Sequence, residues 1–356
     1  MFLIESEIVN FAHINLFFMK SLSRFLALTK FLLAISLFAF AQDEPLPATD
    51  IYLLEISTDK KGKLKFENPV RITKNDNYDN EPWWYPDGSA ILYAGVSDSS
   101  AGDTSKADIY KYDVNAKRTR VVINTPQTAE YSPVLMPNKT GISVVRVLED
   151  KTSQVFANCN DNTDECVNLL PKIKNVGYYV WMDASRVALY LLGDPAILVA
   201  VNLTTGKIDT VAEDIGRCLQ KVPGKNVQIA YVDKSESRWL IKTYDGKSGK
   251  KSTIVETLEE QEDFCYMPDG SLLMGAGSDL YHYVPPTAVA TTTAKGGASS
   301  KNDSKEEKPD KPKKNDNPWD KVAEFEGTSV AQFYRIAVSP KGDKIAVVTY
   351  PDEKPQ

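Results

Sequence analysis

Asp79-Asn80-Glu81-Pro82-Trp83-Trp84-Tyr85-Pro86-Asp87-Gly88-Ser89-Ala90-Ile91-Leu92-Tyr93 decides the fold, because this stretch predicts two strands joined by a tight turn. Pro86 presets the φ angle of the turn, and Gly88 can adopt the positive φ that closes it. Ala90 to Tyr93 then supply an apolar second strand. Weaker copies of this hairpin recur five more times along the chain, so the hairpin is one unit of a repeat.

The five weaker copies keep an apolar or aromatic strand on each side of a turn, although the Pro-Asp-Gly turn itself is partly lost. In chain order they span residues 131–145, 178–190, 218–231, 264–274 and 336–348. The turns, marked by Gly88, Gly141, Ala184, Gly224, Gly270 and Gly342, are 53, 43, 40, 46 and 72 residues apart. A period of about 40–50 residues with four short strands per unit is typical of β-propeller blades.

The interval of 72 residues contains a segment, 285–318, that is rich in Thr, Gly, Ser and Lys and poor in large apolar residues. Such a segment cannot bury enough surface to offset the entropy lost on ordering, so we expect a disordered insertion. Acids and prolines interrupt its basic run, which favours a solvated tether over a polyanion site. Removing about 30 residues restores the period.

The two ends of the chain complete each other. The last copy provides only two strands before Gln356, whereas two spare strands, 51–56 and 70–73, precede the first copy. Pairing these strands closes a ring of sheets and protects their edges. The sequence therefore predicts an all-β fold over residues 50–356: a six-bladed propeller of four-stranded antiparallel blades, with the last blade closed by strands from both termini.

Residues 1–41 have the features of a signal peptide. Lys20, Arg24 and Lys30 form a positive region, 31–40 is an apolar run, and Ala39-Phe40-Ala41 fits a small-x-small cleavage site. Residues 1–18 contain acids but no Lys or Arg, so Met19 is the expected true start. The alternative is an interfacial or N-terminal anchor helix. Cleavage would release a periplasmic or secreted chain that does not span a membrane, with 42–49 as its lead segment.

The motif Asp79-x-x-Pro82-x-Trp84-x-Pro86-Asp87-Gly88, together with Asp-Ile-Tyr and Asp-Leu-Tyr third strands, resembles the WD-like repeats of TolB-type six-bladed propellers. The Ser-Pro element of those repeats survives at Ser339-Pro340. The resemblance covers residues 50–356 and implies a periplasmic or secreted module for protein interaction. Because only residues 42–49 precede the first strand after cleavage, we expect no counterpart of the α/β domain that TolB carries before its propeller.

Four cysteines lie in the part of the chain expected to be exported, where disulfides can form. Cys159 and Cys166 flank a polar loop suited to the tip of a hairpin, so a bridge between them is the most local pairing. Cys218 and Cys265 would then remain, either paired or free. The chain has neither a C-x-x-C pair nor a histidine partner for zinc, and we expect no metal and no cofactor.

The composition narrows the function further. A formal net charge of −6 without a basic stripe argues against a nucleic-acid partner. Only two histidines, His13 and His282, and no Gly-x-Ser-x-Gly motif are present, which disfavours histidine-based catalysis and a serine hydrolase. The motif acids Asp79, Asp87 and Asp269 are expected to accept backbone hydrogen bonds at turns rather than to bind metal.

The candidate binding residues are acidic and aromatic side chains of the first and third copies: Glu81, Trp83, Tyr178, Tyr179 and Trp181. Alternation along a strand sends one of Trp83 and Trp84 into the core between blades and the other to the opposite face. The favoured function is a monomeric, non-enzymatic module that binds an envelope or extracellular protein or peptide. The alternative is a propeller enzyme or binding protein for a polysaccharide, which requires acidic, His or Arg side chains converging at the channel.

Overall fold

The computed structural model describes residues 46–73, 77–97, 106–138, 141–159, 166–286, 317–330 and 332–350. These ranges belong to one unit, Leu46–Gln356, and their regular elements are all strands. The predicted signal peptide, the Met19 start and most of the predicted insertion (287–316) lie outside the described residues. Across the described part of the chain, no helix is long and apolar enough to cross a membrane.

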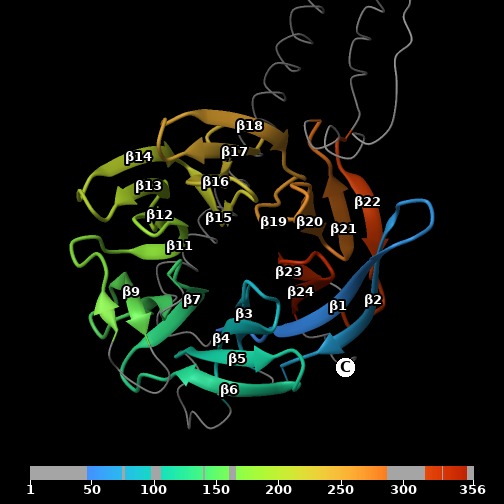
Figure 1. Ribbon diagram of the computed structural model, residues 1–356, viewed down its shortest axis with the longest axis horizontal. Coiled ribbons are helices and arrows are strands. Elements are labelled where there is room, and N and C mark those ends of the chain that lie inside the picture. The colour runs from blue at the N-terminus through green and yellow to red at the C-terminus, as the bar shows by residue number, and fades with distance from the viewer. Residues whose placement is uncertain are drawn as a thin grey trace, which may run out of the picture. The chain divides into compact units, whose positions relative to one another are not determined.

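Six four-stranded antiparallel sheets are arranged in a ring, with one strand of each sheet toward the centre (Figure 1). From the inner strand outward, the first three blades are β3 (Asp79–Trp84), β4 (Ala90–Gly95), β5 (Asp108–Asp113) and β6 (Arg118–Ile123); β7 (Ala129–Leu135), β8 (Ile142–Val147), β9 (Ser153–Cys159) and β10 (Val167–Asn168); and β11 (Val176–Asp183), β12 (Arg186–Leu191), β13 (Ile197–Asn202) and β14 (Ile208–Glu213). The next two are β15 (Ile215–Lys221), β16 (Gln228–Asp233), β17 (Leu240–Asp245) and β18 (Lys251–Glu256); and β19 (Phe264–Tyr266), β20 (Leu272–Ala276), β21 (Asp279–Tyr283) and β22 (Asp320–Glu324).

The closing blade combines both ends of the chain, which confirms the predicted ring closure. From the inner strand outward it contains β23 (Phe333–Val338), β24 (Lys344–Thr349), β1 (Asp50–Thr58) and β2 (Leu64–Arg71). β1 and β24 pair without interruption from Asp50 opposite Thr349 to Glu55 opposite Lys344. β2 begins six residues earlier than the predicted 70–73 strand, because Leu64 and Phe66 pair with the second half of β1.

In the first, third and fifth blades, the hairpin turn is held by an aspartate that accepts a hydrogen bond from the backbone two residues later. In the first blade, Asp87 Oδ1 accepts hydrogen bonds from the Ser89 backbone N–H (2.9 Å) and hydroxyl (2.7 Å). The third copy has neither the proline nor the glycine, yet Asp183 accepts the same two bonds from Ser185 at 2.7 and 2.9 Å. An Asp-x-Ser turn is therefore sufficient to close the degenerate copy.

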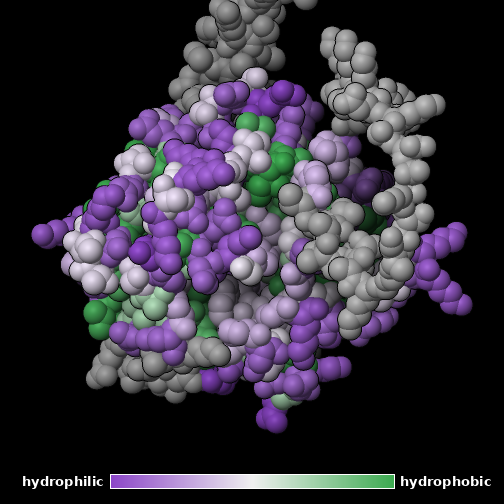
Figure 2. All heavy atoms as spheres, turned by 45° about the horizontal axis from the view of Figure 1, so that its top comes forward, coloured by the Kyte–Doolittle hydropathy of each residue, from purple (hydrophilic) through white to green (hydrophobic). Residues whose placement is uncertain are grey.

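The hydrophobic core is divided among the interfaces between neighbouring blades. Each of the six core clusters joins side chains from two adjacent blades. One of them places Ile51 of β1, Ile91 of β4 and Val348 of β24 together, all fully buried. On the face shown in Figure 2, hydrophilic side chains predominate and hydrophobic ones form small separate areas. Burial between blades thus holds the ring, and the inner strands remain to line the channel.

Candidate functional site

A cavity of about 820 Å³ runs along the central channel. The inner strands of all six blades line it, and they are the first strands of the six sequence copies. Val134, Leu135, Val180, Leu219 and Val338 are among the apolar residues of its wall. A concave, largely apolar wall with a few polar groups is the usual form of a binding site.

Each blade contributes one residue to a polar group at the start of the inner strands, which we call the channel cluster. Its members are Glu81, Ser132, Tyr178, Arg217, Asp263 and Arg335. Glu81, Ser132, Asp263 and Arg335 share a position in the repeat: each is the fifth residue before a turn proline. The repeat therefore places equivalent side chains in the channel, and their types vary from blade to blade.

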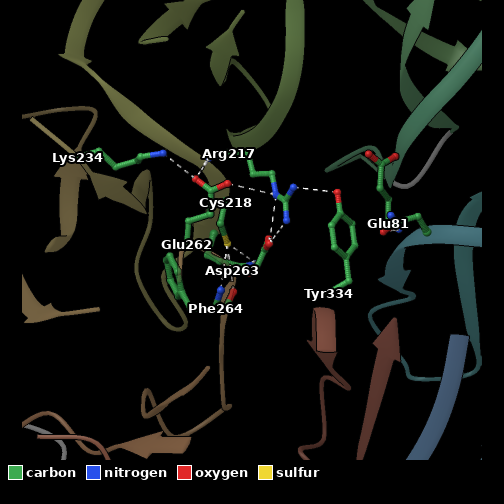
Figure 3. Close-up of polar contacts among 10 residues, drawn as sticks. Glu81, Arg217, Cys218, Lys234, Glu262, Asp263, Phe264 and Tyr334 are labelled. Carbon is green, nitrogen blue, oxygen red and sulfur yellow. Dashed lines mark hydrogen bonds and ion pairs between the residues drawn. The ribbon is translucent and has the colours of Figure 1, made fainter. Parts of the chain in front are cut away.

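Arg217 and Asp263 form the most highly connected pair of the channel cluster (Figure 3). Arg217 Nε donates to Asp263 Oδ2 at 3.1 Å, its Nη2 contacts the same oxygen, and its Nη1 donates to the Tyr334 hydroxyl at 2.8 Å. Glu262 Oε1 lies 3.5 Å from Arg217 Nε, and its Oε2 lies 3.5 Å from Lys234 Nζ. The charge of Arg217 is thus already balanced by carboxylates of the protein.

Glu81 and Ser132 are held in an unusual backbone conformation. Both precede a proline, and both have a positive φ, 60° for Glu81 and 50° for Ser132. Residues other than glycine adopt this conformation at an energetic cost, and such strain is concentrated at functional sites. The strain brings the Ser132 N–H to Glu81 Oε2 as a hydrogen-bond donor. Burial raises the pKa of Glu81, partly offset by Arg335 and the bond from Ser132.

Arg335 differs from Arg217 because no ion pair among the described residues includes it. Its guanidinium carbon lies 5.1 Å from the centre of the Tyr178 ring, a cation–π contact. Its buried Nε has no hydrogen-bond partner in the described part of the chain. Burial lowers its pKa, but Asp263, Tyr178 and Glu81 raise it by more, so the group stays cationic.

The structure brings two of the five predicted binding residues, Glu81 and Tyr178, into the channel cluster. Trp83 is half-buried on the cavity wall and packs edge-on against Tyr85, with ring centres 6.1 Å apart. Tyr179 and Trp181 also border the cavity, but both are about 95% buried. Each donates a 2.8 Å hydrogen bond to Ser143 Oγ of the preceding blade, which ties the two blades together.

Trp83 and Trp84 point to opposite sides of β3, and both sides face a neighbouring blade. Trp84 packs in the interface with the closing blade and donates from Nε1 to the Ala337 carbonyl at 2.9 Å. Trp83 packs against the core shared with the second blade. In a propeller both faces of a blade meet other blades, so strand alternation alone does not separate a core residue from a ligand-facing one.

Four members of the channel cluster, Ser132, Arg217, Asp263 and Arg335, were not predicted from the sequence. Their signal was present: Asp263 and Arg335 occupy the same place as Glu81 ahead of the turn prolines Pro268 and Pro340. When the copies are aligned on their turns, Asp263 and Arg335 fall at the position of Glu81, and this position would have identified both.

Other potentially reactive groups have structural surroundings. Cys159 and Cys166 form the predicted disulfide. Cys218 and Cys265 are buried free thiols, and burial raises the pKa of Cys218 to about 12. His282 lies on β21, the third strand of its blade, and does not border the cavity. Among the residues described, no group of three or more His, Cys, Asp or Glu side chains could hold a metal ion.

Comparison with known proteins identifies the fold and nothing finer. No family model matches the chain, and no curated protein matches it. A putative TolB from Agrobacterium tumefaciens is similar in structure, with a TM-score of 0.56 and 11% identity over 85% of this chain and 98% of that one. TolB from Acinetobacter baumannii gives a TM-score of 0.49 and 14% identity over 70% of this chain, which spans 64% of that protein.

An oligogalacturonate lyase from Vibrio parahaemolyticus has a TM-score of 0.49 and 11% identity, over 85% of this chain and 92% of that one. With six four-stranded blades closed by both termini, the chain has the fold of a TolB-type six-bladed propeller.

Proposed function

We propose that this protein is an exported, non-enzymatic propeller that binds a protein or peptide in its central channel. The observation that carries the proposal is the cavity of about 820 Å³, whose wall is mostly apolar and aromatic; four of its charged groups belong to the channel cluster, and Lys221 and Lys225 add two exposed ones. Such a cavity can bury a peptide segment and orient it through a few polar contacts. No histidine borders the cavity among the described residues, which supports a binding role over histidine-based catalysis.

Export is part of the proposal. The basic and apolar segments of residues 1–41 support it, and so does the Cys159–Cys166 disulfide, a bond typical of oxidising compartments. If the chain is exported, its mature form should begin at Gln42, and a cytoplasmic precursor should begin at Met19. N-terminal sequencing of both forms tests this. A mature protein that keeps residues 1–41 would favour the anchor-helix alternative.

Recovery of a partner through the channel tests the binding function. The wild-type protein serves as bait for an envelope extract, beside two variants that each gain a tryptophan. Gln220→Trp fills the channel, because Gln220 is half-buried on its wall. Gln127→Trp adds the same side chain at an exposed position. We expect the wild type and Gln127→Trp to recover the same protein as a one-to-one complex, and Gln220→Trp to lose it.

A second candidate function is action on, or binding of, an acidic polysaccharide. It is favoured by the convergence of Glu81, Arg217, Asp263 and Arg335, the arrangement that a polysaccharide enzyme would require. A glycan array and an assay for chain cleavage of polygalacturonate distinguish it. Binding or cleavage that Gln220→Trp abolishes, with no protein recovered from the extract, would replace the first proposal by the second.

A further inference from the structure

Arg335 is the one cation of the channel cluster whose charge no neighbouring carboxylate pairs with. Arg217 is paired with Asp263 and Glu262, and Lys234 with Glu262. Arg335 contacts the face of Tyr178 instead, and its buried Nε has no partner among the described residues. A buried N–H without an acceptor is costly, and an anionic ligand that bound it would remove that cost.

Among the described residues, two carboxyl groups act electrostatically on Arg335, Asp263 and Glu81. Asp263 is bound by Arg217, and Glu81 Oε2 accepts a hydrogen bond from the Ser132 N–H. Both Glu81 and Ser132 have a positive φ, and the Glu81 carboxyl lies against the Ser132 N–H. The arrangement leaves the donor edge of Arg335 available to the carboxylate of a ligand, which a guanidinium can bind through two parallel hydrogen bonds.

The remainder of the cavity indicates what carries that carboxylate. Beyond the channel cluster the wall is formed largely by apolar side chains, including Val134, Val180 and Leu219. An oligosaccharide presents hydroxyl groups along its whole length and would need polar partners throughout the cavity. A peptide terminus presents one carboxylate next to an apolar side chain, which matches Arg335 beside an apolar wall. Of the other cations that line the cavity, Arg217 is paired with carboxylates, and Lys221 and Lys225 are exposed.

Resting on the proposed peptide-binding function, we propose that the channel captures the free C-terminal carboxylate of a peptide, with Arg335 as its principal contact and the apolar wall receiving the last side chain. The C-terminus is then the end of the partner that enters the channel. A partner that presented only an internal loop would not fill this position.

The test compares two peptides that differ only at the C-terminus: N-acetyl-Ala-Ala-Leu with a free carboxylate, and the same peptide as a carboxamide. Binding is followed by intrinsic fluorescence, because Trp83 and Trp84 border the cavity. We expect the acid to bind at least tenfold more tightly than the amide. Arg335→Met should remove this difference, and Arg335→Lys should keep part of it.

Arg118→Gln is the matched control, because Arg118 is an exposed arginine on the outer strand β6. It should bind both peptides as the wild type does. The melting temperature of each variant, measured without peptide, shows whether it is folded; Arg335→Gln replaces Arg335→Met if the latter is not.

Three results would overturn the inference. Equal affinity for acid and amide would refute the carboxylate contact but leave peptide binding intact. Absence of binding to either peptide would refute the inference, while the recovery experiment with Gln220→Trp would still decide the proposed function. Tight binding of trigalacturonate that depends on Arg335, without binding of the peptide acid, would assign the site to an acidic saccharide.

Discussion

Asp108 makes the free energy of unfolding depend on pH. Burial, and then the nearby Glu130, raise the pKa of Asp108 from 3.8 to about 6, although a hydrogen bond from the Thr125 backbone opposes them. Because the pKa is higher in the folded state, the folded state binds more protons between about pH 4 and 6. The free energy of unfolding therefore falls as the pH rises through this window, and the cost is fully present above it.

Asp108→Asn removes that cost but keeps an acceptor for the Thr125 N–H. We expect the variant to be about 1 kcal/mol more stable than the wild type at pH 7, since Asp108 is only half-buried, and equal to it near pH 4. Urea unfolding at the two pH values measures both differences. Equal stability at pH 7 would show that Asp108 is not destabilised by its surroundings.

Glu130 and Arg146 form a buried ion pair in the second blade, with Glu130 Oε1 2.8 Å from Arg146 Nε. The two side chains are 0% and 7% exposed, and burial raises the pKa of Glu130. Arg146→Met leaves a buried carboxylate without its partner, so we expect a loss of about 3–5 kcal/mol in the free energy of unfolding. Urea unfolding at pH 7 gives this value.

The double variant Glu130→Gln/Arg146→Met is the control for this prediction, because it removes both charges. It should be more stable than Arg146→Met alone, although Arg146 also donates to Thr125 Oγ1 and lies over the Phe156 ring. A single variant that costs less than about 1 kcal/mol would mean that solvent reaches Glu130.

At the scale of single residues, the sequence predicts positions better than roles. Glu81 was identified because it departs from the repeat, and it lies in the channel. Tyr178, Tyr179 and Trp181 are all aromatic candidates of the third copy, yet the polar atoms of Tyr179 and Trp181 donate to Ser143 between blades. Arg335 was missed, because its importance comes from the absence of an ion pair, and only the spatial arrangement of all six blades reveals that.

At the scale of elements, the Cys159–Cys166 disulfide fastens the shortest strand. β10 contains only Val167 and Asn168, which pair with Ala157 and Phe156 of β9. Closing so short a loop stabilises the folded chain by about 2–2.5 kcal/mol in the chain-entropy description. We expect reduction to lower the melting temperature and to speed amide exchange at Leu169, whose N–H bonds the Val155 carbonyl at 2.9 Å.

The variant Cys159→Ala/Cys166→Ala separates this effect from other thiol chemistry. Its melting temperature should not respond to a reductant, because Cys218 and Cys265 are already free and buried. Calorimetry with and without reductant, combined with a thiol count, measures the response. A wild-type protein that is fully reduced yet melts at an unchanged temperature would contradict the prediction.

Elements were predictable where local chemistry determines them. The hairpin at residues 79–93 formed as expected, because its turn needs only Asp87, Gly88 and Ser89. The bulge in β3 between Asn80 and Trp83 was not predicted, since it requires positive φ at Glu81, a residue type that rarely adopts it. That bulge is part of what turns Glu81 toward Ser132, so the least predictable backbone lies at the candidate site.

At the scale of the whole molecule, ring closure could be inferred by counting strands. The last copy lacks two strands and two spare strands precede the first copy, so the spare strands can complete the last blade. The structure also shows that β1 packs against both of the blades next to the closing blade. Leu54 packs in the interface with the fifth blade, whereas Ile51 packs in the interface with the first. A single strand from the start of the chain therefore contributes to two of the six interfaces.

This double contact makes a prediction about two shortened chains. A chain of residues 46–356 keeps β1 and β2 and should unfold in one cooperative transition. A chain of residues 74–356 lacks both strands and Ile72, which removes four buried apolar side chains, Ile51, Leu53, Leu54 and Ile72. Their loss costs about 8 kcal/mol, comparable to the whole stability of many domains. The exposed edge of β24 should then promote association.

The missing strands can be returned as a separate peptide. Adding residues 46–73 to the 74–356 chain should restore a monomer of the propeller with the peptide bound, because β1 pairs with β24 along six residue pairs. The same peptide with Leu54→Lys should fail, since Leu54 is 1% exposed and cannot accommodate a charge. Light scattering and urea unfolding distinguish these states. A 74–356 chain that is monomeric and as stable as the 46–356 chain would show that the remaining five blades hold the ring without its closing strands.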